Sequence, residues 1–394
     1  MAHILILGAG YGGLRTAREL AKHASSDTQI DLVNDSELHV EKTGLHTIAA
    51  GTRKADAISF KITDVIPSKV NFIKATVSNI DVDNKKVSFS DHDDMTYDYV
   101  VVALGFRSED FGLEGASENA LILESVKTAE KIYDTIEKNI SNYKTSNDPA
   151  DLSIVVCGAG FTGIEMLGEL VDSKQVLKAK YNVPDITVTC LEKATSILPM
   201  FDSELAKYAV NYLTNHGINI ITGADIKKIN KGSVEYQMGD ETKEVKASSI
   251  VWTVGVSGSD VIKASGFDAR RNRVMTTSYL NLEDHPEAFF IGDDSAMIPE
   301  GQDRPLPTTG QLATAQGTIT AQNIANAIND KPLVKFVYKS KGTVASLGQN
   351  HGIAELPSKM KFRGHIASFM KHMSADVGIL EVAGLKTAFR KGTL

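Results

Sequence analysis

Short unbroken apolar runs alternate with amphipathic stretches along this chain. Each run predicts a parallel strand buried on both faces; the clearest lie at 4–7, 30–33, 97–105, 152–157, 186–191, 249–255 and 288–291. The stretches that follow the first and fourth runs have apolar residues at helical spacing, which predicts helices with one buried face: Leu14, Ala17 and Leu20 in the first, and Ile164, Leu167 and Leu170 in the second. This alternation predicts an α/β fold of Rossmann-like, three-layer units.

Two glycine-rich turns join strand to helix, 150 residues apart. Both match the dinucleotide-binding fingerprint in its proper context, so we expect two dinucleotide sites in one polypeptide. The first glycine permits a tight turn, the second lets a pyrophosphate approach the backbone, and the third lets helix and strand pack closely. These positions are Gly8, Gly10 and Gly13 in the first turn and Gly158, Gly160 and Gly163 in the second.

Polar residues at strand ends add candidate sugar contacts. Glu192 ends the second strand of the second unit, where its carboxylate can bind ribose hydroxyls and repel a 2′-phosphate, so we expect NADH rather than NADPH there. Asn34 holds the equivalent position in the first unit. Gly292 and Asp293 follow another buried run and suit a sugar-alcohol hydroxyl. The alternatives are a solvated charge at Glu192 and a plain turn at 292–293.

Bulk properties exclude several classes of protein. A length of 394 residues predicts two or three domains, and the net charge of −7 argues against nucleic acid as the main partner. No run approaches the roughly 18 apolar residues that a membrane span needs. Cys157 and Cys190 lie in predicted strands, so we interpret them as core residues and expect neither a redox pair nor a metal site.

The order of these segments resembles the two-dinucleotide flavoproteins of glutathione-reductase type, the pyridine nucleotide-disulfide oxidoreductases. The resemblance implies FAD on the first fingerprint and NADH on the second, with the NADH unit inserted in the FAD unit. Expected boundaries are 1–115 with 266–330 for FAD, 116–265 for NADH, and 331–394 for a C-terminal membrane or dimer segment. Gly105 then contributes to the FAD site and Gly255 to the NADH site. Disulfide reductases of this family need cysteines near residue 40, and residues 38–46 contain none.

Within that family the chain is similar to type II NADH dehydrogenases, which are single-subunit NADH:quinone oxidoreductases. The resemblance rests on 39–46, 158–165, 306–317 and the basic C-terminus. It implies FAD contacts at Thr43 and Gly310 and a quinone contact at Gln311. The chain departs from the family pattern here, because Gly310 replaces an alanine and Ala315 stands where a second glutamine is expected, with Gln316 one residue later.

Two helix starts carry candidate chemistry. A helix from about Gln311 to Ile328 has its N-terminus placed to stabilise negative charge on reduced flavin, and the alternative is a capped surface helix. Glu165 lies in the first turn after the second fingerprint. It is a candidate proton relay for the catalytic reaction, and the alternative is a carboxylate that the helix N-terminus favours.

Residues 359–394 contain seven Lys or Arg and two Asp or Glu, a net charge of 7 − 2 = +5. The predicted apolar face of a helix here consists of Phe362, Ile366, Phe369, Met370 and Met373. Such a helix fits an anionic membrane surface or a homodimer contact. We therefore expect a peripheral enzyme on the cytoplasmic face of the membrane that oxidises NADH and reduces a quinone without pumping protons. The alternatives are a soluble reductase or oxidase that uses ferredoxin, rubredoxin or oxygen, and an FAD- and NADH-binding redox sensor.

Overall fold

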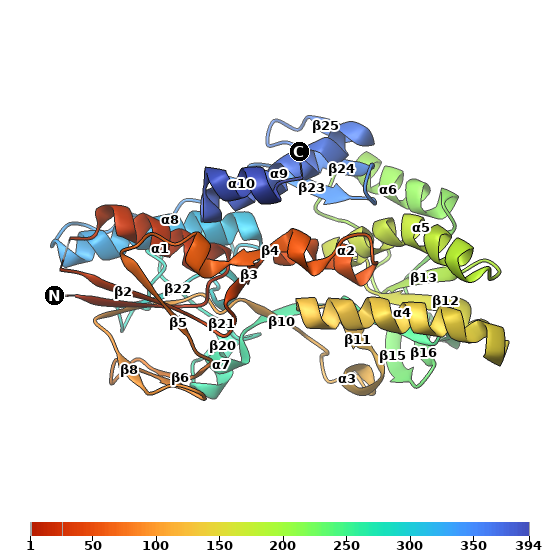
Figure 1. Ribbon diagram of the computed structural model, residues 1–394, viewed down its shortest axis with the longest axis horizontal. Coiled ribbons are helices and arrows are strands. Elements are labelled where there is room, and N and C mark those ends of the chain that lie inside the picture. Colours follow the sequence, from red (N-terminus) through yellow and green to blue (C-terminus); the bar gives the residue numbers. More distant parts are fainter. Residues whose placement is uncertain (1, 26, 394) are drawn as a thin grey trace.

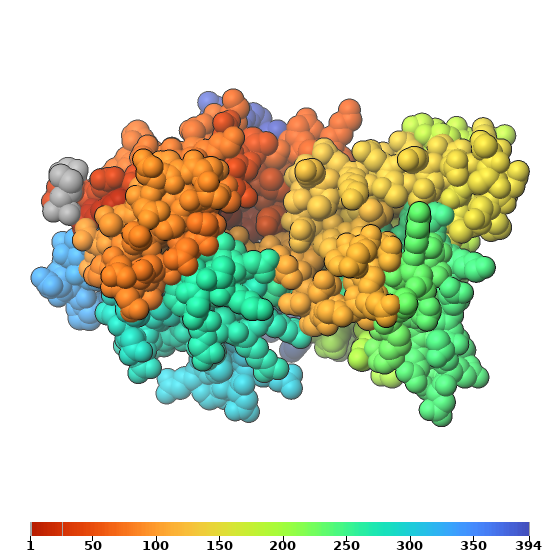
Figure 2. Space-filling view, turned by 90° about the horizontal axis from the view of Figure 1, so that it is seen from below, coloured from red at the N-terminus to blue at the C-terminus, as the bar shows by residue number. Residues whose placement is uncertain are grey.

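The computed structural model describes residues 2–25 and 27–393 and contains two α/β lobes with a C-terminal segment lying across both (Figure 1). This confirms the predicted α/β class. The space-filling view of Figure 2 shows the two lobes side by side, with orange and teal surface on the first and yellow and green on the second.

The first lobe is built on a parallel sheet of order β22-β9-β1-β2-β5. Its strands are β1 (His3–Leu7), β2 (Gln29–Asn34), β5 (Val70–Lys74), β9 (Tyr99–Val102) and β22 (Ala288–Phe290). Ile4 and Ile6 pack toward the helices α1 (Tyr11–His23) and α8 (Gly310–Ile328), while Leu5 and Leu7 pack on the opposite face. Both faces are covered, which explains why the strand is apolar at every position.

An antiparallel sheet covers that opposite face, formed by β6 (Val77–Asp81), β7 (Lys86–Phe89) and β8 (Met95–Thr96). Smaller elements complete the lobe: β3 (Leu38–Val40), β4 (Ser59–Lys61), α2 (Leu45–Ala49), α7 (Asp260–Ala264), β20 (Ala269–Arg270) and β21 (Arg273–Val274). Short 3-10 turns lie at Lys42–Gly44, Ala55–Ile58, Ile62–Asp64 and Gly292–Asp294.

The second lobe repeats this plan with the parallel order β11-β18-β12-β13-β14. Its strands are β11 (Leu121–Ile122), β12 (Ser153–Cys157), β13 (Thr187–Glu192), β14 (Ile218–Thr222) and β18 (Ser249–Trp252). One face carries α4 (Val126–Ser146), α5 (Phe161–Tyr181) and α6 (Ser203–Asn215), and the other carries β15 (Asp225–Asn230), β16 (Ser233–Met238) and β17 (Glu241–Lys246). The lobe also contains α3 (Ala116–Asn119) and a 3-10 turn at Pro149–Leu152. Cys157 and Cys190 are free and buried in its core.

Two antiparallel strands, β10 (Phe106–Ser108) and β19 (Val256–Gly258), carry the chain between the lobes. The first lobe therefore contains residues from both sides of the second lobe, which is an insertion. Ile262 of α7 is fully buried in the first lobe's core, so the chain re-enters that lobe at β19 rather than after 265.

The C-terminal segment forms a small antiparallel sheet and two helices: β23 (Thr343–Ser346), β24 (Gly352–Glu355), β25 (Lys361–Arg363), α9 (His365–Ala383) and α10 (Leu385–Lys391). The predicted apolar face needs correction, because Phe362 lies in β25 and Met370 is half-buried. The exposed apolar stripe of α9 instead consists of Ile366, Phe369, Met373, Val377 and Leu380.

Candidate functional site

The first fingerprint turn is tight at its first and third glycines and open at its second. Gly8 has φ +100°, and a Cβ on Gly13 would lie 1.8 Å from the carbonyl oxygen of Gly8, so both positions require glycine. Nothing lies within 4 Å of a Cβ built on Gly10, so the backbone at the start of α1 is open. The Oδ1 atom of Asn34 accepts a hydrogen bond from the amide of Ala9 at 2.9 Å, which ties the end of β2 to the turn.

The second turn repeats this geometry. Gly158 has φ +98°, a Cβ on Gly163 would lie 2.0 Å from the Gly158 oxygen, and Gly160 is open. Glu192 ends β13, as predicted, and its Oε2 atom accepts a hydrogen bond from the Ala159 amide at 2.6 Å. Its carboxylate is therefore held beside the second fingerprint.

Asp294 joins the loops at the junction of the two lobes. It is completely buried and accepts hydrogen bonds from the amides of Gly105 at 3.0 Å and Ser259 at 2.9 Å. Burial raises its pKa to about 7. Asp293 is the residue that the sequence pattern singled out, and burial raises its pKa against the opposing charges of Lys42 and Arg273. The pattern missed Asp294, although its position directly after the Gly-Asp pair was a signal.

Three predicted glycines lie in loops near this junction, each with a positive φ. Gly105 follows β9 with φ +81°, and Gly292 begins the 3-10 turn after β22 with φ +66°. Gly255 has φ +71°, and a Cβ there would meet the ring of Phe111 at 2.6 Å. Both this contact and the positive φ therefore favour glycine at position 255.

The residues of the first lobe fit FAD. The open backbone at Gly10 and the N-terminus of α1, where Gly10 provides no side-chain cap, suit a pyrophosphate. The N-terminus of α8 also begins in this lobe, capped by Thr309, whose hydroxyl accepts a hydrogen bond from the Leu312 amide at 3.1 Å. Gly310 begins that helix, and a Cβ there would lie 3.3 Å from the ring of Tyr11.

Gln311 and Gln316 have different environments on α8. The Oε1 atom of Gln311 is buried and has no hydrogen-bond partner among the described residues. Gln316 is fully buried, and its Oε1 atom accepts a hydrogen bond from the Gly292 amide at 2.7 Å. Gln316 therefore stabilises the turn at Gly292. Its side chain is engaged there, so it does not take the place of the glutamine that the family pattern has at position 315.

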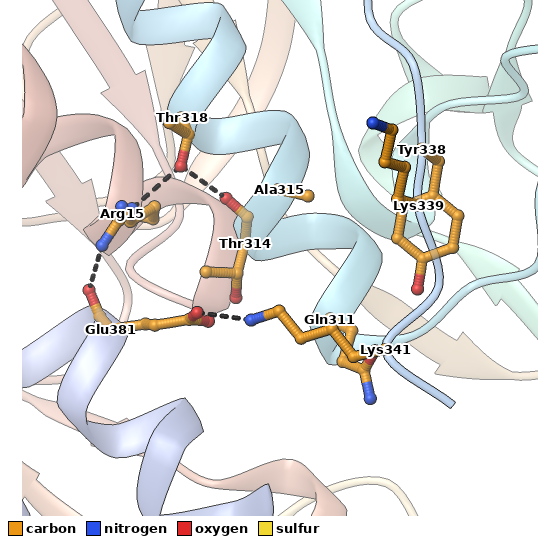
Figure 3. Close-up of a pocket in the computed structure, with 9 residues that line it drawn as sticks. All are labelled: Arg15, Gln311, Thr314, Ala315, Thr318, Tyr338, Lys339, Lys341 and Glu381. Carbon is orange, nitrogen blue, oxygen red and sulfur yellow. Dashed lines mark hydrogen bonds and ion pairs between the residues drawn. The ribbon is translucent and has the colours of Figure 1, made fainter. Parts of the chain in front are cut away.

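Gln311 lines a small pocket between α1, α8, α9 and residues 338–341 (Figure 3). Arg15 crosses one side, donating hydrogen bonds to Thr318 at 2.9 Å and to the carbonyl oxygen of Glu381 at 3.0 Å. Lys341 donates to the Glu381 carboxylate at 2.6 Å. The wall near Gln311 thus contains both charged and aromatic groups, the latter from Tyr338.

Glu165 lies deep in the second lobe, against the C-terminal segment. Its Oε1 atom is 2.6 Å from Nζ of Lys371 on α9 and accepts a hydrogen bond from the Ser346 amide at 2.9 Å. Burial opposes ionisation, but Lys371, His46 and Ser346 together hold the pKa of Glu165 below its usual value. Among residues 2–25 and 27–393, no hydrogen bond or ion pair joins Glu165 to Gln311.

Two further buried groups lie near Glu165: His46, which ends the 39–46 segment of the family resemblance, and Glu169, which the sequence pattern did not single out. His46 of α2 lies 3.7 Å from Glu165, and burial lowers its pKa to about 4, so it is neutral near pH 7. Glu169 lies one helical turn beyond Glu165, is 3% exposed and accepts a hydrogen bond from the hydroxyl of Thr52. Burial raises the pKa of Glu169 to about 7. The i, i+4 spacing of the two glutamates was the available signal.

Across the residues that the structure describes, no cluster of three or more His, Cys, Asp or Glu side chains could hold a metal ion. Within the same ranges, no helix has the length and apolar content of a bilayer-spanning segment.

Comparison with known proteins places the chain in a family. Residues 2–317 match the model for pyridine nucleotide-disulphide oxidoreductases. The type II NADH:quinone oxidoreductase of Staphylococcus saprophyticus is 40% identical over 99% of this chain and 98% of its own length, and that of Staphylococcus aureus strain NCTC 8325 is 39% identical over the same shares.

Solved structures show the same fold. NDH2 from Plasmodium falciparum, determined with NADH, aligns with a TM-score of 0.86 at 17% identity, covering 99% of this chain and 97% of that one. Sulfide:quinone oxidoreductase from Aquifex aeolicus aligns with a TM-score of 0.80 at 22% identity, covering 97% of this chain and 92% of that one. The chain therefore belongs to the pyridine nucleotide-disulphide oxidoreductase family, within its type II NADH:quinone oxidoreductase branch.

Proposed function

We propose that this protein oxidises NADH in its second lobe and transfers two electrons, through FAD in its first lobe, to a quinone at a membrane surface. The observation that carries the proposal is the pair of fingerprint turns, each with an open second glycine, in two lobes linked by β10 and β19. Relatives at 40% identity over nearly the whole chain are named for this reaction.

On this proposal, NADH binds with its pyrophosphate at the turn of Gly158, Gly160 and Gly163 and its adenosine ribose at Glu192. Gly255 lies on the nicotinamide side. Hydride transfer needs no general acid or base, so the lobe acts mainly by holding the donor within reacting distance.

FAD, when bound, accepts a hydride and gives up electrons one or two at a time. We propose that the following first-lobe residues hold it: Gly8, Gly10, Gly13, Asn34, Thr43, Gly105, Gly292, Asp293 and Gly310. The positive end of α8 favours negative charge at its N-terminus. Gly310 keeps this helix end close to Tyr11, since a side chain there would press on the ring.

We propose that Gln311 donates a hydrogen bond to a quinone carbonyl in the pocket of Figure 3. Glu165 is the second catalytic candidate, as a proton carrier. Its pairing with Lys371 supports an ionised resting state, so it would accept a proton before passing one on. Glu165 also couples the second lobe to α9.

The exposed stripe of α9 supports docking on a membrane. Five large apolar side chains, between 39% and 61% exposed, follow one another at intervals of three or four residues, and Phe389 of α10 is 83% exposed. The net charge of +5 on residues 359–394 overstates how strongly this segment attracts anionic lipid. Lys371 is turned inward to Glu165, and Lys361 pairs with Asp202 and Glu204. We therefore propose that insertion of the apolar side chains of α9 into the cytoplasmic face of the membrane contributes most of the binding.

The test compares two electron acceptors. Gln311→Leu should lower the rate of quinone reduction about tenfold, because one hydrogen bond worth about 1.4 kcal/mol is lost, while ferricyanide reduction by NADH stays unchanged. Gln302→Leu, at an exposed loop residue, is the matched control. Wild-type protein that reduces ferredoxin or oxygen faster than quinone would overturn the quinone assignment.

A further inference from the structure

A chain of hydrogen bonds ties β3 and the segment after it to the first fingerprint turn. Nδ1 of His39 lies 2.8 Å from the carbonyl oxygen of Ala9, and Nε2 lies 2.9 Å from Oε1 of Glu41. The hydroxyl of Tyr11 donates to Oε2 of the same carboxylate at 2.7 Å. It also lies 3.1 Å from Oγ1 of Thr43.

This chain is shielded from water. His39 is 1% exposed and Glu41 is 7% exposed. The imidazole stacks on the ring of Phe60, with centroids 4.7 Å apart, and meets the edge of Tyr11 at 5.6 Å. Among the described residues, His39 is the sole ion-pair partner of Glu41, because no lysine or arginine lies within 4.0 Å of that carboxylate.

The hydrogen-bond partners fix how many protons the pair holds. A backbone carbonyl only accepts, so Nδ1 of His39 must carry a proton. A second proton must lie between Nε2 and Oε1, since two lone pairs facing each other at this distance would repel. Whether that proton is closer to nitrogen or to oxygen, His39 and Glu41 together hold one transferable proton and are neutral as a unit.

Tyr11 leads from this pair toward the proposed reaction centre. It is the first residue of α1, and its ring packs against Gly310, which precedes the candidate quinone ligand Gln311. Burial, reinforced by Glu41, raises the pKa of Tyr11 well above its ordinary value, so the phenol stays protonated. It can therefore pass a proton by donating one and accepting another in the same step.

Quinone reduction by NADH takes up one proton from water: NADH + H⁺ + quinone gives NAD⁺ + hydroquinone. The hydride accounts for both electrons and one hydrogen nucleus, so one further proton must reach a quinone oxygen. Near the α8 N-terminus, the His39–Glu41 pair is a buried store that holds such a proton.

We propose that His39 and Glu41 store the proton that quinone reduction consumes, on a route separate from that of Glu165, and that Tyr11 and Thr43 carry it toward the quinone oxygen. This inference rests on the proposed function. In the transfer, a hydroxyl O–H bond of Tyr11 or Thr43 breaks as the quinone oxygen gains its proton. The proton of the pair then re-forms that O–H bond, and a proton from water restores the pair. The electrons come from NADH.

The first test separates proton transfer from electron transfer in the FAD-loaded protein. Glu41→Gln keeps the size of the side chain but cannot share the proton. It should lower quinone reduction about 100-fold and leave reduction of ferricyanide, which takes electrons without protons, unchanged. Glu37→Gln, at a side chain that is 64% exposed, is the matched control and should alter neither rate.

Tyr11→Phe removes one hydroxyl and keeps the ring against Gly310. In this variant, deuterated water should slow quinone reduction more than it does in the wild type and leave ferricyanide reduction unaffected. Retained FAD, measured as flavin absorbance per protein, shows that the site is intact. Equal losses with both acceptors in Glu41→Gln, with FAD retained, would mean that the network only braces the turn and would overturn the relay.

A second readout needs no turnover. In protein with ¹⁵N-labelled histidine, the His39 resonances should show a proton bound or shared at both nitrogens at neutral pH, and Nε2 should lose this proton in Glu41→Gln. An Nε2 atom without a proton in the wild type would overturn the proposal that His39 and Glu41 store one. Wild-type protein that reduces ferricyanide but no quinone would instead overturn the proposed function itself.

Discussion

Replacing Lys371 with methionine should destabilise the protein in a pH-dependent way, because it leaves the Glu165 carboxylate buried without its cation. The Glu165 and Lys371 side chains are 6% and 20% exposed. Removing one partner from a buried pair costs about 3–5 kcal/mol. We expect about 3 kcal/mol, the lower end of that range, because the amide and hydroxyl of Ser346 still donate to Glu165 at 2.9 and 3.2 Å.

The sign of the pH dependence follows from the pKa of Glu165. In the wild type the pKa of Glu165 is lowered from its ordinary value of 4.5. The ionised carboxylate therefore stabilises the folded state at pH values above 4.5, and this contribution is lost as the pH falls. Without Lys371, burial raises the pKa above that value instead. The folded state then binds more protons than the unfolded state, and stability falls as the pH rises from about 5 to 8.

The assay is equilibrium urea unfolding followed by circular dichroism at both pH values. Lys371→Met should lose more free energy of unfolding at pH 8 than at pH 5, and Glu165→Gln combined with it should recover most of that difference. Lys386→Met, at an exposed position on α10, is the control. An equal loss at both pH values, or no recovery in the double variant, would refute the reasoning.

Three further predictions concern the dinucleotide sites and the C-terminal helix. Gly13→Ala should abolish FAD retention and give a colourless protein, because the new Cβ would lie 1.8 Å from a backbone oxygen. A yellow variant would show that the backbone of the turn can shift to accommodate the Cβ. Glu192→Gln should weaken NADH binding and narrow the preference over NADPH by about 1 kcal/mol, a typical value for a hydrogen bond, measured by KM for both nucleotides; an unchanged KM ratio would place the ribose elsewhere. Phe369→Ser with Met373→Ser should reduce flotation with anionic liposomes and leave ferricyanide reduction intact; unchanged flotation together with loss of a dimer in sedimentation would assign the stripe to a homodimer.

The sequence by itself determined the parts of this protein that depend on local chemistry. The apolar runs predicted β1, β2, β9, β12 and β13, because parallel strands buried on both faces have no polar side. The glycine spacing predicted both turns, because the backbone and contacts at the first and third glycine of each turn exclude other residues. Glu192 and Asn34 were predictable from their place at strand ends.

Tertiary structure alone decided which polar groups meet, because those partners are far apart in the chain. Glu165 meets Lys371 across 206 positions, 371 − 165, and Asp294 meets Gly105 across 189. Periodicity likewise predicted an apolar helix face near the C-terminus but misjudged its members. Which side of a helix is exposed depends on the neighbour against which it packs, and the contacts of α9 with Glu165 and with the first lobe fixed that rotation.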